Sequence, residues 1–351
     1  MALILAKSQE AQKAYRLVQG LQHQFVKKLN RLSESLGEQQ EFEEVTWLRD
    51  EGVHGGGSRF EARDEKIFNT GSVNISQVHY NKDENKNLLC ATAISTIIHP
   101  KNPHAPSLHM HISLTELQNG ENYWRLMADL NPSIFHEEDK ISFDAMLKES
   151  AKEHFKEAML QGNKYFNIPA LKRHRGVSHF YLENFTTQDY AKDLEFADSF
   201  GNAVINSYVT IVEQALQQRV SCSSRDISMQ LKYHTLYLFQ VLTLDRGTIS
   251  GLLIHNQNDL GIMGSLPGYV DRDLLHSWAK NVPSPQDELV KTIADAINLE
   301  GKIDNATKLQ FAYIIREHYK KYPNATEFLA SGNTIPMTVE NHSAITESLT
   351  P

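Results

Sequence analysis

The segment from Cys90 to Pro132 constrains the fold most, because its pattern of apolar, polar and proline residues divides it into consecutive predicted strands. Residues 88–98 are apolar or small, are rich in Ile and Thr and show no helical periodicity, which predicts a buried strand. A stiff, proline-rich linker at 100–106 separates it from a second predicted strand at 107–117. A third strand is predicted to end at Asp129. Three such strands in succession predict an antiparallel meander.

Polar side chains fall on one face of the second predicted strand. His109, His111 and Ser113 are spaced by two residues, so they share a face. The other face carries Met110, Ile112 and Leu114. If the strands pair as consecutive hairpins, the Asp129 carboxylate lies near both imidazoles. The sequence therefore predicts a site with one acid and several histidines on one face of a sheet.

Periodicity predicts the other elements. Amphipathic or helical patterns cover residues 8–36, 141–160, 189–218 and 304–322, with Thr186 and Thr187 as candidate N-caps of the third helix. Strands are predicted at 68–80, paired with 88–98, and at 180–182. Alternation at 235–244, followed by 249–254, predicts another hairpin. Gly55–Gly57 is expected to form a flexible lid, and the polar residues 331–351 a loosely held tail.

Composition excludes several classes of protein. The 351 residues are 40% hydrophobic and 22% charged, as in soluble globular proteins. The net charge of -8 and the absence of a basic run argue against nucleic acid as a partner. No apolar stretch approaches the length of a membrane span. Two cysteines and an N-terminus without a basic region ahead of its apolar run favour a cytoplasmic protein.

A series of short blocks extends over about residues 45–300. The blocks are Trp47-x-Arg49, Gly55-Gly56-Gly57-x-Arg59, Phe68-x-x-Gly71-x-Val73-Asn74-x-Ser76-x-Val78-His79, Ser95-x-x-x-His99-Pro100-x-Asn102-Pro103-His104-x-Pro106-x-x-His109, Ala128-Asp129-Leu130-x-Pro132, Glu137-Glu138-Asp139, Arg175-Gly176, Asp245-Arg246-Gly247-Thr248-x-x-Gly251-Leu252 and Ser265-Leu266-Pro267. In order and rough spacing they resemble the oxygen-dependent coproporphyrinogen III oxidase family. The chain is similar to a diverged member of it.

This resemblance implies an α+β fold, with a large, mainly antiparallel sheet flanked by helices on both faces. Residues 1–300 would form one coproporphyrinogen-oxidase-like domain, followed by a C-terminal helical extension and polar tail at 301–351. The family oxidatively decarboxylates two propionates of a small-molecule porphyrinogen to vinyl groups in haem biosynthesis. It uses O2 as co-substrate and no organic cofactor, and its members are homodimers.

The resemblance also implies roles for individual residues. Asp129 matches a carboxylate that faces the pyrrole N–H groups, and His109 a proposed proton donor. The substrate-binding set would include Ser95, His111, Ser113, Arg175 and Arg246. Simpler interpretations remain open: Asp129 could cap the turn at Asn131-Pro132, and Arg246 could pair with Asp245 or another acidic residue.

Several arginines of the family pattern are missing here. The family has Asn-x-Arg where this chain has His111-Ile112-Ser113, and an arginine-bearing loop where it has His255-Asn256-Gln257. The family's Arg-Arg-Gly-Arg run is replaced by Tyr233-His234-Thr235-Leu236. A substrate with four carboxylates needs cations to balance it, so these changes favour a different substrate.

Histidines occupy some positions where the family pattern has arginines. This raises the alternative of a metal site. Some bacterial members are assigned four metal-binding histidines. His99 and His109 match two of them, while Asp144 and Ala170 stand at the others. With His111 added, the set His99, His109, His111 and Asp144 could hold a divalent metal such as Fe, Mn or Cu. Hydrogen-bonded strand histidines are the simpler interpretation.

Three functions therefore stay open. The first is an aerobic coproporphyrinogen III oxidase. The second is a diverged, metal-dependent oxidase or decarboxylase that uses O2 on another substrate. The third is a non-catalytic protein that binds a tetrapyrrole or a metal.

Overall fold

Alternating side chains build the central sheet of the computed structural model, which describes residues 3–38, 41–62, 66–81, 83 and 85–342. Seven antiparallel strands follow the order β1-β2-β3-β4-β5-β6-β9. The strands are β1 Glu43–Leu48, β2 Gly55–Ala62, β3 Phe68–His79, β4 Leu88–Pro100, β5 Ser107–Leu117, β6 Asn122–Asn131 and β9 Ser178–Phe185. A separate ribbon pairs β7 Asn167–Ile168 with β8 Arg173–His174. The predicted meander at 88–131 is confirmed.

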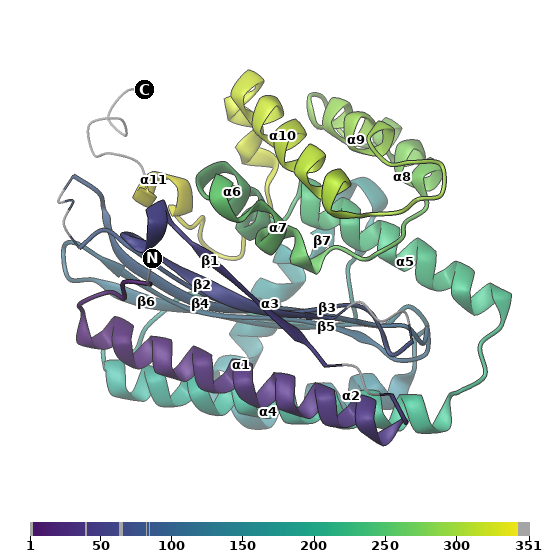
Figure 1. The fold of residues 1–351 in the computed structure, drawn as a ribbon, viewed down its shortest axis with the longest axis horizontal. Coiled ribbons are helices and arrows are strands. Elements are labelled where there is room, and N and C mark those ends of the chain that lie inside the picture. The colour runs from purple at the N-terminus through teal and green to yellow at the C-terminus, as the bar shows by residue number, and fades with distance from the viewer. Residues whose placement is uncertain (1–2, 39–40, 63–65, 82, 84, 343–351) are drawn as a thin grey trace.

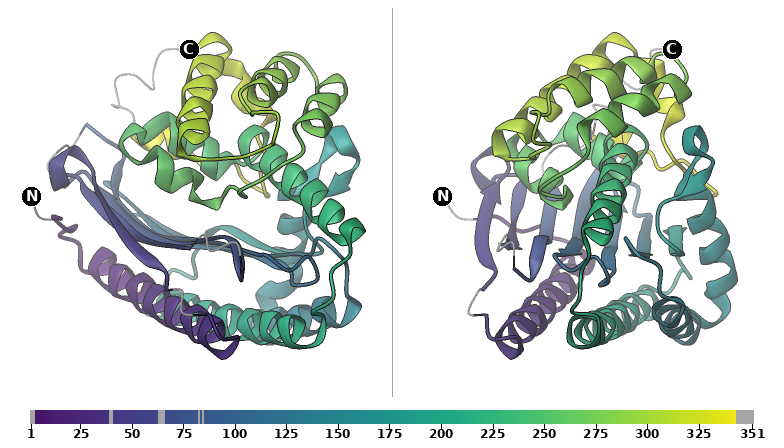
Figure 2. Two further views of the ribbon diagram at one scale, coloured as in Figure 1. Left: turned by 45° about the vertical axis from the view of Figure 1, so that its right-hand side comes forward. Right: turned by 90° about the vertical axis from the view of Figure 1, so that its right-hand side faces the viewer.

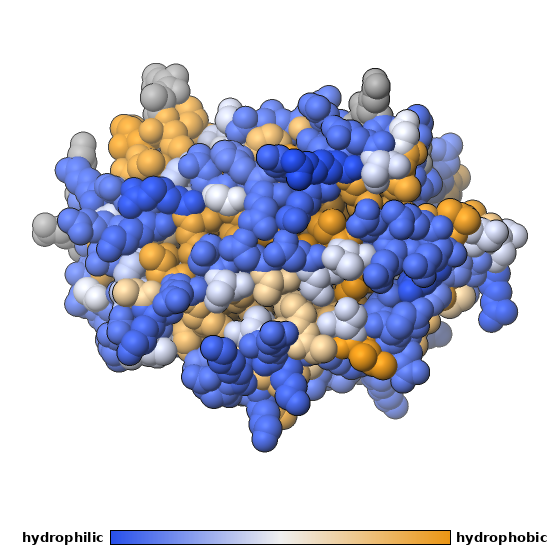
Figure 3. Space-filling view, turned by 90° about the horizontal axis from the view of Figure 1, so that it is seen from below, coloured by the Kyte–Doolittle hydropathy of each residue, from blue (hydrophilic) through white to orange (hydrophobic). Residues whose placement is uncertain are grey.

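One face of the sheet packs on long helices (Figures 1 and 2). These are α1 Gln9–Ser35, α2 Glu137–Ala151 and α4 Tyr190–Gln218, while α3 Phe155–Tyr165 lies along β9. The apolar side chains of β5, such as Met110 and Ile112, share one core with Phe25 of α1 and Phe200 of α4. The outer surface of this helical layer is mainly hydrophilic (Figure 3).

The other face is covered by the C-terminal half of the chain (Figure 1). Its helices are α5 Ser224–Thr243, α6 Arg246–Ile254, α7 Asp259–Ile262, α8 Arg272–Trp278, α9 Gln286–Asp295, α10 Asn305–Lys321 and α11 Thr338–His342. A second core joins these helices and includes Phe311 of α10 and Leu238 of α5. The predicted α+β fold, with helices on both faces of an antiparallel sheet, is confirmed. Among the described residues, no helix is both long and apolar enough to span a membrane.

The predicted hairpin at 235–254 is wrong, because α5 and α6 occupy these residues. Residues 233–243 are all buried, so apolar side chains lie on every side of the helix and their alternation carries no information about strands. The helix signal was at the start: Ser223 and Asp226 form a reciprocal capping box. Asp245 caps α6 by accepting a hydrogen bond from the Thr248 amide.

Three further predictions, on a helix cap, a helix and the C-terminal segment, differ from the structure in detail. Asp189, rather than Thr186 or Thr187, caps α4. The predicted helix at 141–160 is broken between α2 and α3, where Lys152 has a φ of 48°. Of the expected loose tail, residues 331–342 are partly exposed but include α11, in which Asn341 is buried; residues 343–351 lie outside the described part.

The expected lid at Gly55–Gly57 is the first part of β2, so this prediction is also wrong. A Cβ atom on Gly57 would lie 2.0 Å from the backbone oxygen of Ile75 on β3. The glycines therefore serve close approach between strands rather than flexibility.

We expect Gly57→Ala to lower the free energy of unfolding by about 1–3 kcal/mol, because the strand must move away from the Ile75 carbonyl. Urea denaturation at neutral pH measures the change. Gly20→Ala is the matched control: Gly20 lies in α1, and a Cβ atom there would have no neighbouring atom within 4 Å, so this change should raise stability by about 0.5–1 kcal/mol. Equal effects of both substitutions would contradict the close-packing argument.

Candidate active site

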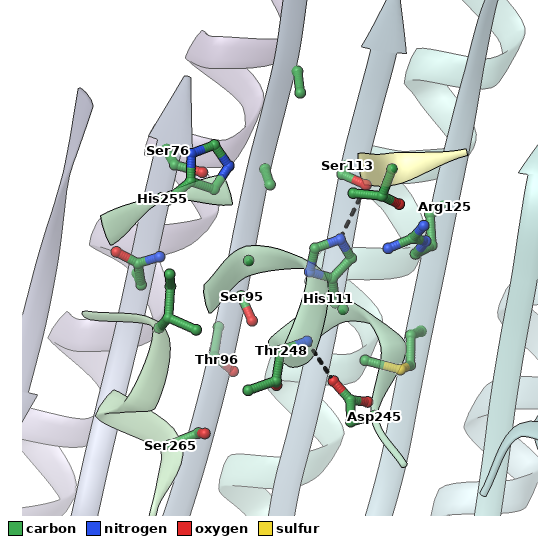
Figure 4. A pocket seen from close by; sticks show the side chains of 18 of the residues that line it. Ser76, Ser95, Thr96, His111, Ser113, Arg125, Asp245, Thr248, His255 and Ser265 are labelled. Atoms are coloured by element: carbon green, nitrogen blue, oxygen red, sulfur yellow. Dashed lines mark hydrogen bonds between the residues drawn. The ribbon is translucent and has the colours of Figure 1, made fainter. Parts of the chain in front are cut away.

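A cavity of about 250 Å³ lies between the sheet and the second helical layer (Figure 4). Strands β3 to β6 supply its floor through the side chains that point away from α1 and α4. The opposite side is formed by residues of α6, α11 and the turn Met263–Ser265. Its lining is rich in hydroxyl and amide groups, including Ser72, Asn74, Ser76, Ser95, Thr96, Ser113, Thr115, Ser265 and Asn341.

Strand register places the predicted site residues in rows across the floor. Ser95 of β4 lies opposite His111 of β5, and both line the cavity. In the next row, His109 lies opposite Asp129 of β6. Ser113 also lines the cavity, next to His111 (Figure 4). The sequence prediction that these side chains share one face of the sheet is therefore confirmed by the register.

A buried ion pair lies beneath His109. The Nη2 and Nε atoms of Arg175 donate to Asp129 Oδ2 at 2.6 and 3.1 Å, and both side chains are fully buried. Asn131 Nδ2 donates to the same oxygen at 2.7 Å. Of the two predicted catalytic residues, only His109 lines the cavity, while Asp129 is inaccessible. Asp129 therefore acts on the site through Arg175.

Arg175 also fixes the protonation state of His109. Its Nη2 lies 2.8 Å from His109 Nδ1. Because a guanidinium only donates, Nδ1 must accept, so the neutral ring carries its proton on Nε2. Burial and the nearby Arg175 charge hold the pKa of His109 well below its usual range. His109 thus serves the cavity as a neutral N–H donor.

His111 is held as a neutral ring by a different environment. Its Nε2 lies 3.0 Å from Ser113 Oγ. Burial, together with the charge of Arg125 on β6, lowers the pKa of His111 to about 3. Arg125 itself donates from Nε to Glu183 Oε1 at 2.8 Å, and the Glu183 side chain is fully buried. The Arg125 charge is therefore already balanced by a carboxylate.

Asp245 is a site residue to which the sequence analysis gave no role. It lines the cavity, accepts from Tyr165 Oη at 3.0 Å through Oδ1 and from the Thr248 amide at 2.8 Å through Oδ2. Of the described residues that line the cavity, it supplies the sole carboxylate. Its place in the Asp-Arg-Gly-Thr block was the signal that could have identified it.

Two further histidines reach the cavity from distant parts of the chain. His255 follows α6, and His342 ends α11. In sequence, His255 stands out only as a departure from the family pattern. His342 falls in the predicted polar tail, because nothing in a short polar segment indicates where that segment docks.

Arg246, predicted to bind substrate, makes its hydrogen bonds outside the cavity in the described structure. Its guanidinium donates to the backbone oxygens of Ala330, Thr326 and Leu329 at 3.2–3.3 Å. It does not line the cavity, and it does not pair with Asp245. Arg246 instead anchors the segment that leads to α11. Arg175, the other arginine predicted to bind substrate, forms its ion pair with Asp129.

The residues considered as metal ligands are not brought together. Asp144 lies on α2, in the helical layer on the far side of the sheet, and pairs with Lys140. His99 uses both ring nitrogens, bonding to Ser107 Oγ at 2.8 Å and the Ser265 oxygen at 3.1 Å. Across the described residues, no group of three or more His, Cys, Asp or Glu side chains is placed to hold a metal ion. The donor set does not fit a metal, and the histidines follow the simpler, hydrogen-bonded interpretation.

Comparison with known proteins identifies the family. The family model described as coproporphyrinogen III oxidase matches residues 13–298. The chain belongs to the coproporphyrinogen III oxidase family. The match covers the whole sheet, the helices on one face and α5 to α9 on the other, but not α10 and α11.

Curated relatives agree with this assignment. The mitochondrial oxygen-dependent coproporphyrinogen-III oxidase of Homo sapiens is 28% identical over 260 residues, and that of Rattus norvegicus is 29% identical. These matches cover 67% of this chain but only 56% and 58% of the two relatives. The oxygen-dependent coproporphyrinogen-III oxidase of Drosophila melanogaster is 28% identical over 284 residues, covering 74% of this chain and 71% of the relative.

We expect Asp129→Asn to lower the free energy of unfolding by about 3–5 kcal/mol, because it leaves the Arg175 charge buried without a counter-charge. Arg175→Met should have a comparable effect, since it leaves Asp129 unpaired. The double variant should recover much of that loss. Urea denaturation at neutral pH measures all three, and additive losses in the double variant would show that the two charges are not coupled.

We expect the stability of the protein to fall as the pH drops below about 6.5, where histidines of the unfolded chain take up protons. His111 stays neutral in the fold down to its pKa of about 3, so the unfolded state binds more protons in this range. His111→Gln should therefore reduce the slope of unfolding free energy against pH by at most about 1.4 kcal/mol per pH unit. Denaturation curves across this range measure the slope, with the exposed His276→Gln as control. An unchanged slope in His111→Gln would contradict the assignment.

Proposed function

We propose that this protein catalyses the O2-dependent oxidative decarboxylation of a porphyrinogen-type substrate bound in the sheet cavity. The observation that carries the proposal is the geometry of the family blocks: His109 and Asp245 both line one cavity, and His109 is backed by the buried Arg175–Asp129 pair. Family membership adds the reaction class.

The proposed reaction balances without an organic cofactor. Each propionate loses its carboxylate as CO2 and a hydride equivalent from the carbon attached to the pyrrole ring, which leaves a vinyl group. O2 accepts that hydride equivalent and, with one further proton, becomes H2O2. The electrons come from the substrate, so the protein must orient the ring, donate and accept hydrogen bonds and control protons.

The residues divide these tasks by charge. Asp245 is the carboxylate available to accept hydrogen bonds from pyrrole N–H groups, and its two bonds to Tyr165 and Thr248 hold it in place. His109, as a neutral Nε2–H donor, can hold an oxygen atom of O2 or of a substrate carboxylate. Ser95 and His111 add polar contacts beside it.

The charge balance of the cavity favours a second candidate, an O2-using oxidase of the same family with a less acidic substrate. Arg125 and Arg175 are each paired with a buried carboxylate, so neither charge is free for a substrate propionate. A substrate with fewer carboxylates than coproporphyrinogen would fit this balance better. The two candidates share a chemical site and differ in specificity.

We expect purified protein to convert coproporphyrinogen III to a divinyl product under air and not under argon. The product is measured as porphyrin fluorescence after separation and chemical oxidation. His109→Phe and Asp245→Asn should each reduce kcat by about 100-fold or more, as expected for groups that move protons or hold the reacting atoms. The half-buried His154→Gln, remote from the cavity, is the control.

Each other outcome selects a different function. Turnover of a porphyrinogen with fewer carboxylates, but not of coproporphyrinogen III, supports the second candidate. Binding of coproporphyrin III without turnover of any porphyrinogen contradicts the enzymatic proposal and leaves a tetrapyrrole-binding protein.

A further inference from the structure

One end of the cavity carries a cluster of basic and aromatic side chains that the proposed reaction does not use. Arg49, just after β1, donates from Nη2 to Tyr80 Oη at 2.8 Å and from Nη1 to His255 Nδ1. Tyr80 Oη lies 2.9 Å from His342 Nδ1. His255 and His342 contact each other edge to face, with ring centroids 5.0 Å apart. Four segments of the chain therefore meet at one point of the cavity wall.

The hydrogen-bond network assigns both histidines the same protonation state. Arg49 is always a donor, so His255 Nδ1 accepts and its proton sits on Nε2. Tyr80 Oη accepts from Arg49, which leaves its own proton for His342 Nδ1. Burial and the Arg49 charge lower the pKa of His342 to about 3, and burial, His342 and Arg49 also lower the pKa of His255. Both rings line the cavity as neutral N–H donors.

The charge behind these donors is poorly balanced, unlike the other arginines near the cavity. Arg125 and Arg175 face fully buried carboxylates. Arg49 has Asp50 as its ion-pair partner among the described residues, at 3.7 Å, and that carboxylate is 49% exposed. Lys86 adds a second positive charge 5.7 Å from the Tyr80 ring. Arg49 and Lys86 therefore stand behind the two N–H groups, and the carboxylate paired with Arg49 is exposed rather than buried.

We propose that His255 and His342, backed by Arg49 through direct contact and through Tyr80, form a subsite for one carboxylate of the substrate. The anion accepts hydrogen bonds from the imidazole N–H groups, while Arg49 supplies the balancing charge from behind. The identity of the molecule that bears the carboxylate rests on the proposed function. The carboxylate site itself is independent of that function.

The subsite explains the change at 255–257, where the family pattern has an arginine and this chain has His255-Asn256-Gln257. Arg49 belongs to the Trp47-x-Arg49 block that this chain shares with the family pattern, and it keeps a cation in direct contact with His255 at this end of the cavity. Gln257 ties the two segments together, accepting from the Asp50 amide at 2.8 Å and donating to the Asp50 carboxylate at 3.0 Å. The second donor, His342, comes from α11, which lies outside the family match. The C-terminal segment thus supplies specificity that the family domain does not carry.

Sodium propionate is the direct probe of this subsite, because it carries the carboxylate without the ring. Titration of the protein with propionate, followed by NMR of the histidine ring nitrogens, should shift the His255 and His342 signals in a saturable way. Propionamide, the uncharged equivalent, should not do so. In Arg49→Met the response should be lost, while Arg272→Met, the same charge change on α8, should keep it. Equal responses to propionate and propionamide, an unchanged response in Arg49→Met or no response in the wild type overturns the proposal.

Tyr80→Phe tests whether Arg49 acts on His342 through the Tyr80 hydroxyl group, as distinct from a general loss of stability. It keeps the aromatic ring and the Arg49–His255 contact but removes the bridge to His342. The His342 response to propionate should weaken while the His255 response remains. Loss of neither would contradict the relay through Tyr80.

Turnover distinguishes failure of the subsite from failure of the proposed function. With coproporphyrinogen III, Arg49→Met should raise KM by about tenfold or more, as for loss of a charge-assisted contact, with a smaller change in kcat. An unchanged KM in an active variant would overturn the subsite alone. A wild type that binds propionate at these histidines but turns over no porphyrinogen would overturn the proposed function and leave the carboxylate site intact.

Discussion

A guanidinium sealed in the interior is the constraint around which the site is arranged. Arg175 is fully buried, so its charge must be balanced and its N–H groups must be bonded. Asp129 supplies the charge, while Gln240 of α5 and His109 of β5 accept the remaining bonds described. Its guanidinium carbon also lies 4.6 and 4.9 Å from the ring centres of Phe166 and Tyr237. One residue thereby joins the sheet to the helical layer above it.

The chain reaches that position through a conformation that only glycine adopts easily. Gly176 has a φ of 72°, and a Cβ atom there would lie 2.7 Å from the Leu130 oxygen. The backbone can therefore pass against the end of β6 and bring Arg175 over Asp129. The Arg175-Gly176 pair of the family pattern has a physical explanation: one residue supplies the charge and the next permits its approach.

A common arrangement follows for the histidines of the cavity. Arg175 stands behind His109, and Arg49 stands behind His255, so each imidazole presents an N–H group to the cavity while the charge stays one layer away. This gives directional hydrogen bonds without a free guanidinium at the surface of the cavity. The two backing arginines differ in charge balance, because Arg175 is paired with a fully buried carboxylate, whereas the carboxylate that pairs with Arg49 is 49% exposed. Arg125, like Arg175, is paired with a buried carboxylate, that of Glu183.

The sequence predicted what short-range periodicity encodes. Strands β4 to β6 alternate along buried and cavity-lining faces, so the spacing of His109, His111 and Ser113 was enough to place them on one face of the sheet. The same rule failed at 235–244, because a helix buried on all sides has no polar face to mark its period.

Long-range contacts could not be predicted in this way. Asp129 and Arg175 are 46 residues apart and look like two independent substrate ligands until their pairing is seen. His342 meets Tyr80 across 262 residues, and no local pattern encodes that contact.

The position of the His109 proton is the most direct test of the site, because Arg175 must determine which ring nitrogen carries it. Neutron diffraction on deuterium-exchanged crystals at neutral pH locates the exchangeable hydrogens of both side chains. We expect deuterium on His109 Nε2, none on Nδ1 and a fully deuterated Arg175 directed at Nδ1 and Asp129. Deuterium on Nδ1, or Arg175 turned away from His109, would contradict it.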